Sequence, residues 1–388
     1  MKAAAVSLLL VMPALISPAA AAPNIWYKLC TREPVTSSGD VAAGNVCQTL
    51  ADVRDNKTAV LIGHVSVQQF PEQKGYQLEV LLPLGSALPP GALVKIDDGE
   101  PVKLAYKSCD AGGCYARAAV GHAFIQQMRT GKKVAYLSID VKGKALNIPL
   151  PLDRFAESFD APEIPVEKYK ADQKKIAEVI AKRFAEAGKP APAPAARPAF
   201  EKTGENAVVN SGWYKLCTEV QVPEKQDKAT GVPPPTKKTM VCLTQVDIRD
   251  ADSMVLAGKL AARKVDGRPQ WEVLAMLPLG FSIPEGAEVH IDKKAPIKLN
   301  FTTCDAAGCF AQANLPDAAL EDLKGGQEVS YSGIDARGGS ILVPLSLAGF
   351  KAAFDGNPMP IETYNAEMRR VAETIAVRAA RRRKEQRP

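Results

Sequence analysis

The sequence predicts a mainly β protein built from two tandem copies of one module, each an antiparallel sandwich or barrel followed by a helix. The hexapeptide Trp26–Thr31 returns unchanged at residues 213–218. From Cys47 onward the two copies align without a gap at a constant offset of 195 residues. Cys47 corresponds to Cys242, for example, and Cys109 to Cys304. Within each copy, apolar and polar residues alternate with the period of two that is typical of half-buried strands.

Length supports the same division. A chain of 388 residues exceeds the usual size of one core, so two units of about 150 residues are expected. We expect the following boundaries: a signal peptide over 1–21, a first sandwich over 22–162, an amphipathic helix over 163–187, a Pro/Ala-rich linker over 188–207, a second sandwich over 208–357, and a second amphipathic helix with a basic tail over 358–388.

The N-terminus has the features of a secretory signal. Lys2 precedes an apolar run over residues 3–16, and small residues follow at 19–22, which favours cleavage after Ala21. No later segment approaches the roughly 20 apolar residues that a spanning helix needs. We therefore expect a periplasmic or outer-surface protein.

Short strands separated by turns follow the signal. Val102, Leu104 and Tyr106 alternate with polar neighbours, and glycine-, proline- and aspartate-rich turns separate such runs. About seven or eight short strands per copy favour an antiparallel arrangement over a parallel α/β sheet. Gly63 interrupts a β-branched run over residues 60–67 and has the counterpart Gly258 in the second copy, which predicts a bulge or tight bend.

A helix is predicted after each set of strands, beginning near Pro165 and Pro360. Its apolar residues form one stripe that covers little more than two heptads, so we expect each helix to pack on its own module rather than form a coiled coil. The alternating prolines and alanines after the first helix favour an extended, semi-rigid spacer.

Cysteines are expected to form disulfides, because export places them in an oxidising compartment. Four cysteines per copy allow three pairings. Short loops favour Cys30–Cys47 with Cys109–Cys114, and correspondingly Cys217–Cys242 with Cys304–Cys309. A four-thiolate zinc site is the alternative, although the usual zinc-knuckle spacing is absent. A redox-active dithiol over residues 109–114 is a further alternative that lacks the expected two-residue spacing.

Duplication also bears on catalysis, since chemistry that belongs to the module should occur in both copies. None of the three histidines, His64, His122 and His290, is duplicated. A histidine-centred triad or metal site is therefore not predicted, and no metal or other cofactor is expected.

Several duplicated polar residues remain, and we interpret them as structural. Asp97, Asp110 and Asp140 lie in turn contexts, where an aspartate side chain bonds its own backbone. Arg54 lies between two aspartates and is interpreted as one half of an ion pair.

The C-terminal tail carries most of the net charge of +6. Its basic residues suit an anionic surface, with lipid headgroups or lipopolysaccharide as partners and nucleic acid disfavoured by export. A solvated helix end whose cations complement the helix dipole is the alternative. The candidate residues are Arg378, Arg381, Arg382, Arg383, Lys384 and Arg387.

Together these marks resemble the invasion-associated locus B family of Gram-negative bacteria, in two copies. In the first copy they are Trp26, Cys30, Cys47, Leu82-Pro83-Leu84-Gly85, Ile96-Asp97, Cys109-Asp110, Gly113-Cys114 and residues 152–159. The resemblance implies immunoglobulin-like β-sandwiches, export, an association with entry into host cells, and no established enzymatic activity. It does not cover the linker or the terminal helices.

We therefore expect an exported, non-catalytic cell-envelope binding protein that contributes to host-cell interaction and binds a protein or an envelope surface. An envelope enzyme or thiol-redox factor is one alternative. A structural or chaperone-like envelope component is another.

Overall fold

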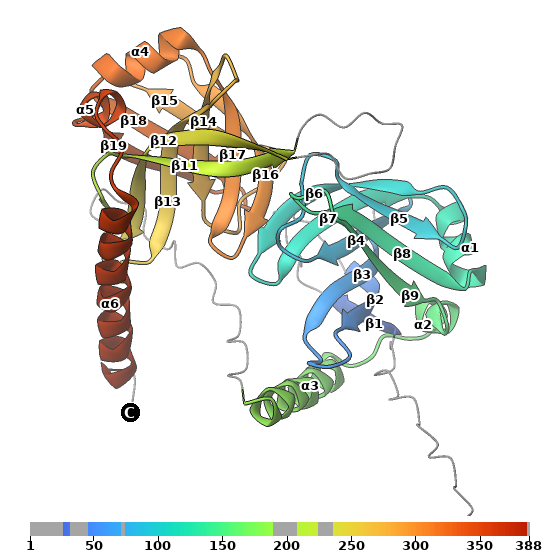
Figure 1. Cartoon of the computed structure of the whole chain (residues 1–388). Helices are drawn as coiled ribbons and strands as arrows, with labels where there is room; N and C mark the ends of the chain where they lie inside the picture. The colour runs from blue at the N-terminus through green and yellow to red at the C-terminus, as the bar shows by residue number, and fades with distance from the viewer. Residues whose placement is uncertain (1–25, 32–45, 71–73, 189–207, 224–235, 386–388) are drawn as a thin grey trace, which may run out of the picture.

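The computed structural model describes residues 26–31, 46–70, 74–188, 208–223 and 236–385 (Figure 1). The predicted signal peptide, residues 189–207 of the predicted linker and residues 386–388 of the tail lie outside this part. Antiparallel strands dominate both copies, and a long helix follows each. The predicted mainly β fold, with two tandem sandwich-like modules, is confirmed.

The first module contains nine described strands in one antiparallel path, slightly more than predicted. Their order is β1-β2-β3-β4-β7-β6-β5-β8-β9. The path folds over so that buried side chains of β3, β4, β7, β5 and β8 share one core. The elements are β1 (Trp26–Thr31), β2 (Val46–Arg54), β3 (Leu61–Gln69), β4 (Tyr76–Leu82), β5 (Ala92–Ile96), β6 (Val102–Asp110), β7 (Gly113–Val120), α1 (His122–Thr130), β8 (Lys133–Ile139), β9 (Ala145–Pro151), α2 (Phe155–Asp160) and α3 (Val166–Glu186).

The second module repeats this path and adds a short strand, β10, along the edge of β12. The elements are β10 (Val208–Asn210), β11 (Tyr214–Pro223), β12 (Thr236–Asp250), β13 (Leu256–Val265), β14 (Trp271–Leu277), β15 (Ala287–Ile291), β16 (Ile297–Asp305), β17 (Gly308–Leu315), α4 (Asp317–Gly325), β18 (Glu328–Ile334), β19 (Ser340–Ser346), α5 (Phe350–Asp355) and α6 (Ile361–Glu385).

The predicted irregularity at the duplicated glycines is a β-bulge. Pairing shifts register directly after Val53 opposite Gly63 in one module, and directly after Ile248 opposite Gly258 in the other. A Cβ atom at Gly63 would lie 2.5 Å from the hydroxyl oxygen of Tyr136. Glycine is therefore needed because a buried tyrosine packs directly against the backbone.

Aromatic rings close the end of each sandwich. Trp26 packs edge-on against Phe155 with ring centroids 4.8 Å apart, and Trp213 meets Phe350 at the same distance. The Trp26 indole N–H donates to the Pro151 carbonyl at 3.1 Å. Phe155 and Phe350 are fully buried. The repeated tryptophan thus anchors β1 to α2 in the first module and the start of β11 to α5 in the second.

The described residues contain the four short-loop disulfides favoured from the sequence: Cys30–Cys47, Cys109–Cys114, Cys217–Cys242 and Cys304–Cys309. Each joins directly opposite residues on neighbouring antiparallel strands. All eight cysteines of the sequence lie within the described residues, and each belongs to one of these four bonds.

The two modules meet through reciprocal backbone hydrogen bonds. Gly85 N–H donates to the Cys304 carbonyl at 2.7 Å, and its counterpart Gly280 donates to the Cys109 carbonyl at the same distance. Each module therefore offers the same loop and the same strand end to the other, which is the arrangement of a two-fold symmetric dimer.

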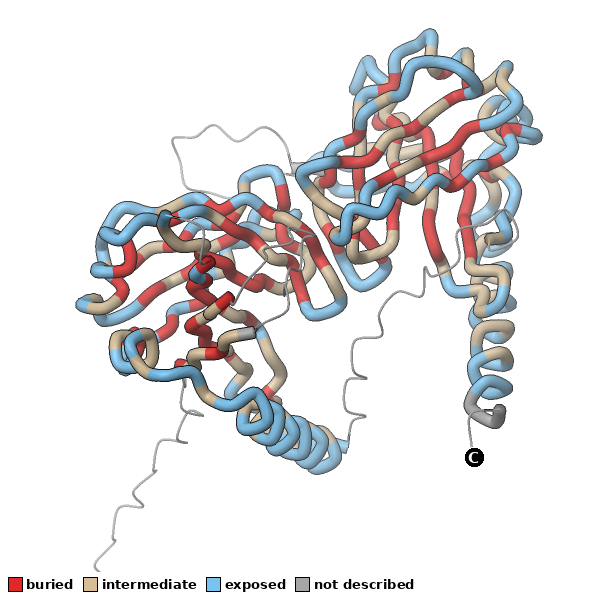
Figure 2. The backbone as a smooth tube through the Cα atoms, turned by 180° about the vertical axis from the view of Figure 1, so that it is seen from behind, coloured by how far each residue is buried: buried red, intermediate tan, exposed pale blue. Residues whose placement is uncertain are grey.

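A second reciprocal pair extends this junction. Leu88 N–H donates to the Thr302 carbonyl at 2.9 Å, and Ile283 N–H donates to the Lys107 carbonyl at 2.8 Å. Figure 2 shows strands of both modules, with buried residues in red, approaching each other at this boundary. The chain is in effect a dimer of modules within one polypeptide.

Candidate binding groove and sulfur cluster

A partly buried ion pair links helix α3 to the first module. Asp52 on β2 accepts hydrogen bonds from Arg54 at 2.7 Å and from His64 at 2.9 Å. Arg54 also donates to the Gln173 side chain on α3 at 3.1 Å. Burial opposes ionisation of Asp52, but the hydrogen bonds and charges of His64 and Arg54 outweigh it and lower the pKa of the carboxyl group. The predicted ion pair of Arg54 is confirmed, and its partner is Asp52.

Tyrosines pack beside this ion pair. The rings of Tyr27 on β1 and Tyr169 on α3 meet edge-on with centroids 5.7 Å apart. Burial and the nearby Asp52 charge raise the pKa of Tyr169 to about 12. Burial also raises the pKa of Tyr27, so both rings are neutral at physiological pH and pack the helix against the module.

The second module has an equivalent cluster with different partners. Asp247 accepts hydrogen bonds from Arg249 at 2.9 Å and from the Tyr214 hydroxyl at 3.0 Å. Lys259 takes the place of His64 and lies 3.1 Å from the carboxylate. Met368 takes the place of Gln173 and receives the Arg249 hydrogen bond at 3.7 Å. The cluster is more enclosed, since the Asp247 side chain is 2% exposed against 12% for Asp52.

An arginine on each long helix forms a second link. Arg183 donates to the Asn56 carbonyl at 3.0 Å, and its counterpart Arg378 donates to the Ala251 carbonyl at 2.7 Å and the Asp252 carbonyl at 3.1 Å. Sequence reasoning grouped Arg378 with the basic tail and missed this role. The offset of 195 between Arg183 and Arg378 is the signal that would have revealed it.

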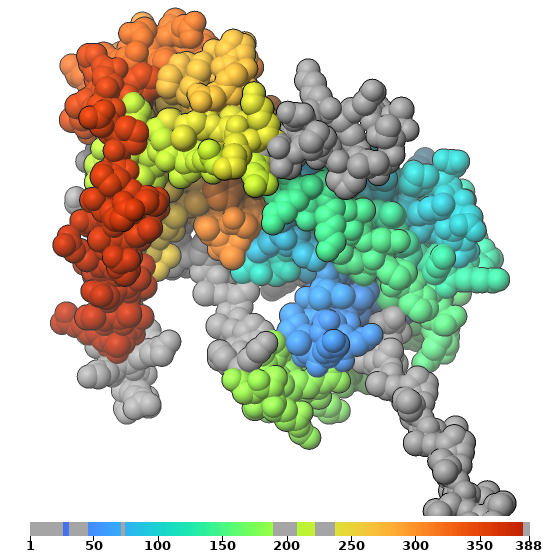
Figure 3. All heavy atoms as spheres, viewed as in Figure 1, coloured from blue at the N-terminus to red at the C-terminus, as the bar shows by residue number. Residues whose placement is uncertain are grey.

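A groove remains between α3 and the first module, with a volume of about 1070 Å³. Figure 3 shows α3 (green) lying against the first strands of that module (blue). No residue of α3 is fully buried, and Ile62 and Val179 at the groove remain 38% and 42% exposed. The lining also includes the apolar Leu146, Ile148 and Ile176, the cationic Lys57, Lys175 and Arg183, and the acidic Asp52 and Asp55.

The corresponding crevice of the second module is smaller, about 370 Å³. Its walls include Val209 and Asn210 of β10, the strand that pairs with the edge of β12 at Ile248 and Arg249. Among the described residues of the first module, no strand pairs with the equivalent edge at Val53 and Arg54. Among the described residues, the difference in volume therefore coincides with the presence of strand β10 in the second module.

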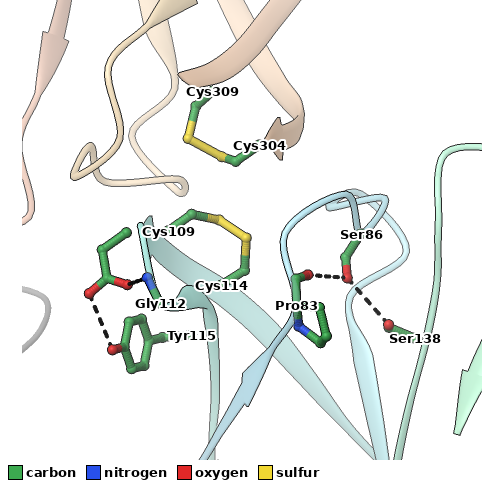
Figure 4. Close-up of a disulfide and its surroundings, with 10 residues drawn as sticks. Pro83, Ser86, Cys109, Gly112, Cys114, Tyr115, Ser138, Cys304 and Cys309 are labelled. Atoms are coloured by element: carbon green, nitrogen blue, oxygen red, sulfur yellow. Dashed lines mark hydrogen bonds between the residues drawn. A yellow bond between two sulfur atoms is a disulfide. The ribbon is translucent and has the colours of Figure 1, made fainter. Parts of the chain in front are cut away.

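Sulfur atoms from both modules gather at the junction. The Sγ atoms of Cys109, Cys304 and Cys309 all lie within 4.8 Å of one another, and all three residues are fully buried. Figure 4 shows the Cys304–Cys309 disulfide facing the Cys109–Cys114 disulfide across the boundary. Sequence reasoning treated the two disulfides as separate clamps, because the duplication gives no information about how the copies pack.

The histidines lie in three different settings. His64 belongs to the Asp52 cluster, and the His122 ring packs against Tyr76. His290 Nε2 lies 3.3 Å from the Ser332 hydroxyl and 3.4 Å from a Glu288 carboxylate oxygen. A catalytic triad needs the acid and the hydroxyl on opposite ring nitrogens. Here both partners face the same nitrogen, so the arrangement is that of a surface hydrogen-bond cluster.

The predicted turn aspartates occupy turns. Asp110 accepts a hydrogen bond from the Gly112 backbone at 2.7 Å, and Asp140 accepts from the backbone of Lys142 and Lys144 at 2.8 Å. Asp97 accepts from the backbone of Lys132 and Lys133, which lowers the pKa of its carboxyl group. The structural interpretation is confirmed for Asp110 and Asp140, whereas Asp97 bonds the distant start of β8 rather than its own turn.

Of the candidate tail residues, the described helix α6 carries five, Arg378 to Lys384, and Arg387 lies beyond it. Arg381 and Arg382 have exposed side chains, and the charge of Arg382 contributes to lowering the pKa of Asp250. No helix among the described residues is long and apolar enough to cross a membrane. Contact between the tail and an anionic surface remains a prediction.

Comparison with known proteins gives the same two segments. A profile of the invasion associated locus B protein family matches residues 26–163 and again residues 213–358. Two invasion protein B homologues of Brucella abortus, from strain 2308 and from biovar 1 strain 9-941, are each 29% identical over 125 residues, covering 31% of this chain and 69% of theirs. The crystal structure of invasion associated protein B from Bartonella henselae is also similar, with a TM-score of 0.30 and 15% identity, covering 39% of this chain and 95% of that one.

The two family matches together span more than half of the chain and coincide with its two β modules. The chain therefore belongs to the invasion associated locus B protein family and carries two copies of the family's module.

Proposed function

We propose that this chain is an exported, non-catalytic binding protein of the bacterial cell envelope that contributes to contact with host cells. Membership of a family named for invasion supports the role. The four disulfides support a compartment outside the reducing cytosol. The relatives carry names of invasion proteins rather than of enzymes, which is consistent with binding as the activity.

The groove beside α3 is the observation that carries this proposal. Exposed large apolar side chains that line a concave surface are typical of interaction sites. Ile62 and Val179 lie on opposite walls of the groove, one on the sheet and one on the helix. A partner that enters the groove would remove both side chains from water.

The favoured occupant is an extended polypeptide segment of a partner protein. The second module supplies the precedent, since its own strand β10 pairs with the edge of β12 and fills the equivalent place. Addition of a strand to an open sheet edge is a common mode of peptide recognition, in which backbone hydrogen bonds give affinity and alternate side chains give specificity. The edge at Val53 and Arg54 offers the same backbone geometry.

A peptide that reproduces residues 204–212, which include β10, is the direct probe. We expect saturable binding of this labelled peptide to the full chain by fluorescence anisotropy. Val179→Glu should weaken binding about tenfold, because the substitution places a charge on the apolar wall. The matched control is Val377→Glu, on the exposed face of α6, where Val377 is already 69% exposed and lines neither crevice.

A peptide methylated at the backbone nitrogen of Val209 distinguishes strand pairing from non-specific hydrophobic binding. It keeps every side chain and removes one backbone hydrogen-bond donor. Equal binding of the methylated peptide, or equal loss in both chain variants, would count against the groove. The cellular counterpart is an invasion assay with a deletion strain that expresses the wild type, Val179→Glu or Val377→Glu. Host entry restored equally by all three would refute a role of the groove in host contact.

A further inference from the structure

The junction sulfurs form one cluster although they belong to two disulfides. Cys109 Sγ lies within 4.8 Å of both sulfurs of the Cys304–Cys309 bond. The reciprocal hydrogen bonds of Gly85 and Gly280 end on the carbonyls of Cys304 and Cys109, so the backbone of the junction itself holds these cysteines face to face. The Cys30–Cys47 disulfide is different: among the described residues, its sulfurs are grouped with one carboxylate, that of Glu163, and with no third sulfur.

We propose that Cys109, Cys304 and Cys309 form a thiol–disulfide exchange centre through which the two modules become covalently joined. Exchange requires a thiolate that approaches a sulfur of an existing disulfide. The cluster places the acceptor disulfide of the other module within 4.8 Å of Cys109 Sγ. All four cysteines are fully buried, so the external dithiol reaches the Cys109–Cys114 bond only when the junction opens locally.

The reaction balances with one external dithiol. The dithiol reduces the Cys109–Cys114 bond, is itself oxidised to a disulfide, and leaves two thiols. Cys109 loses its proton and attacks Cys304 or Cys309, and the bond between those two sulfurs breaks. The released sulfur takes a proton. The products are one disulfide between the modules and two thiols, Cys114 and the released cysteine.

The product would differ mechanically from the starting state. Both hairpin clamps would be open, and a covalent bond would replace them at the centre of the module junction. Because the starting disulfides each close a short hairpin within one module, the exchange converts two local clamps into one long-range crosslink. A dithiol-carrying envelope oxidoreductase is the class of partner that would drive it.

Trypsin reports the exchange directly. In the starting state, Cys109 and Cys114 share the tryptic peptide 108–117, and Cys304 and Cys309 share the peptide 299–324. We expect Cys114→Ser, which leaves Cys109 without its partner, to yield peptides 108–117 and 299–324 joined by a disulfide in non-reducing mass spectrometry. One thiol of the second module should become available to an alkylating reagent after denaturation.

The matched control is Cys47→Ser, which leaves Cys30 as a thiol away from the junction. Here we expect Cys30 to be alkylated and no link to any peptide of the second module. Wild-type protein treated with a limiting amount of dithiothreitol and then quenched with acid is a second arm, which needs no variant to fold. It should show the same joined peptides.

Two results would overturn the proposal. One is an alkylatable Cys109 with unlinked peptides in both Cys114→Ser and the limiting-dithiol arm. The other is crosslinking of Cys30 to the second module in Cys47→Ser at a similar yield, because that would mean indiscriminate exchange.

Discussion

The two modules share their anchors and differ at their crevices. Both have the tryptophan against a buried phenylalanine, the glycine bulge beneath a buried tyrosine, and an arginine from the long helix to the same turn. The crevice beside α6 is lined by β10 and three methionines, whereas the groove beside α3 is about three times as large. The shared anchors therefore support the fold of both modules, whereas the larger groove is a property of the first module alone.

The largest expected effect concerns the shared anchors. Phe155→Ala and Phe350→Ala should each lower the free energy of unfolding by about 3–5 kcal/mol, because each removes a fully buried ring from its core. Urea titrations followed by tryptophan fluorescence would measure both. If one variant is nearly neutral, the two modules do not depend equally on this anchor.

Smaller losses of unfolding free energy are expected when the buried carboxylates are replaced. Asp247→Asn should cost about 3 kcal/mol, because it leaves Arg249 and Lys259 without their shared counter-charge in an enclosed site. Asp52→Asn should cost about 1.5 kcal/mol, since its site is more exposed and its partners reach water. Equal losses in the same urea assay would contradict the inferred difference in enclosure.

Acid should weaken the ion pair of Asp52 in the first module. The pKa of Asp52 is lowered in the folded state, so its contribution is complete above the ordinary value of 3.8 and is lost as the pH falls through the lowered pKa. The unfolding free energy of the wild type should therefore decline more steeply than that of Asp52→Asn as the pH falls below about 4. Parallel curves would mean that Asp52 does not contribute.

The long helices should differ in their response to anionic membranes. Deletion of residues 381–388 should weaken sedimentation with phosphatidylglycerol vesicles about tenfold at low salt, because it removes cations but leaves the Arg378 link. The control is Lys174→Ala with Lys175→Ala on α3, which removes exposed charge from the other helix. Vesicle binding that survives the deletion, or falls as much in the control, would rule out a specific role for the tail.

Much of the fold could be predicted from the sequence because the duplication repeats each local signal. Alternation gave the strands, short loops favoured the disulfide pairs, and Gly63 with Gly258 indicated the bulges. Strand β10 was not predicted as a separate element, since Val208 and Val209 form too short a run to stand out from the linker. Arg378 was assigned to the tail because its neighbours are also arginines, which hid its correspondence with Arg183.

The sites that arise from packing could not be predicted in the same way. The groove depends on how closely α3 approaches the sheet, and the apolar stripe of α3 is equally compatible with a tight or a loose fit. The sulfur cluster depends on the orientation of one copy relative to the other. Only long-range contacts fix that orientation, such as those of Gly85 and Gly280.

Reciprocal docking of the two copies has a consequence for how the family module can diversify. A pair assembled from identical chains must carry every substitution on both sides and exists only when the subunit concentration exceeds the dissociation constant. Fusion removes both restrictions, since the second half is always present at high local concentration. One half can then specialise its crevice while the other preserves the shared scaffold, so a single gene encodes a permanent heterodimer.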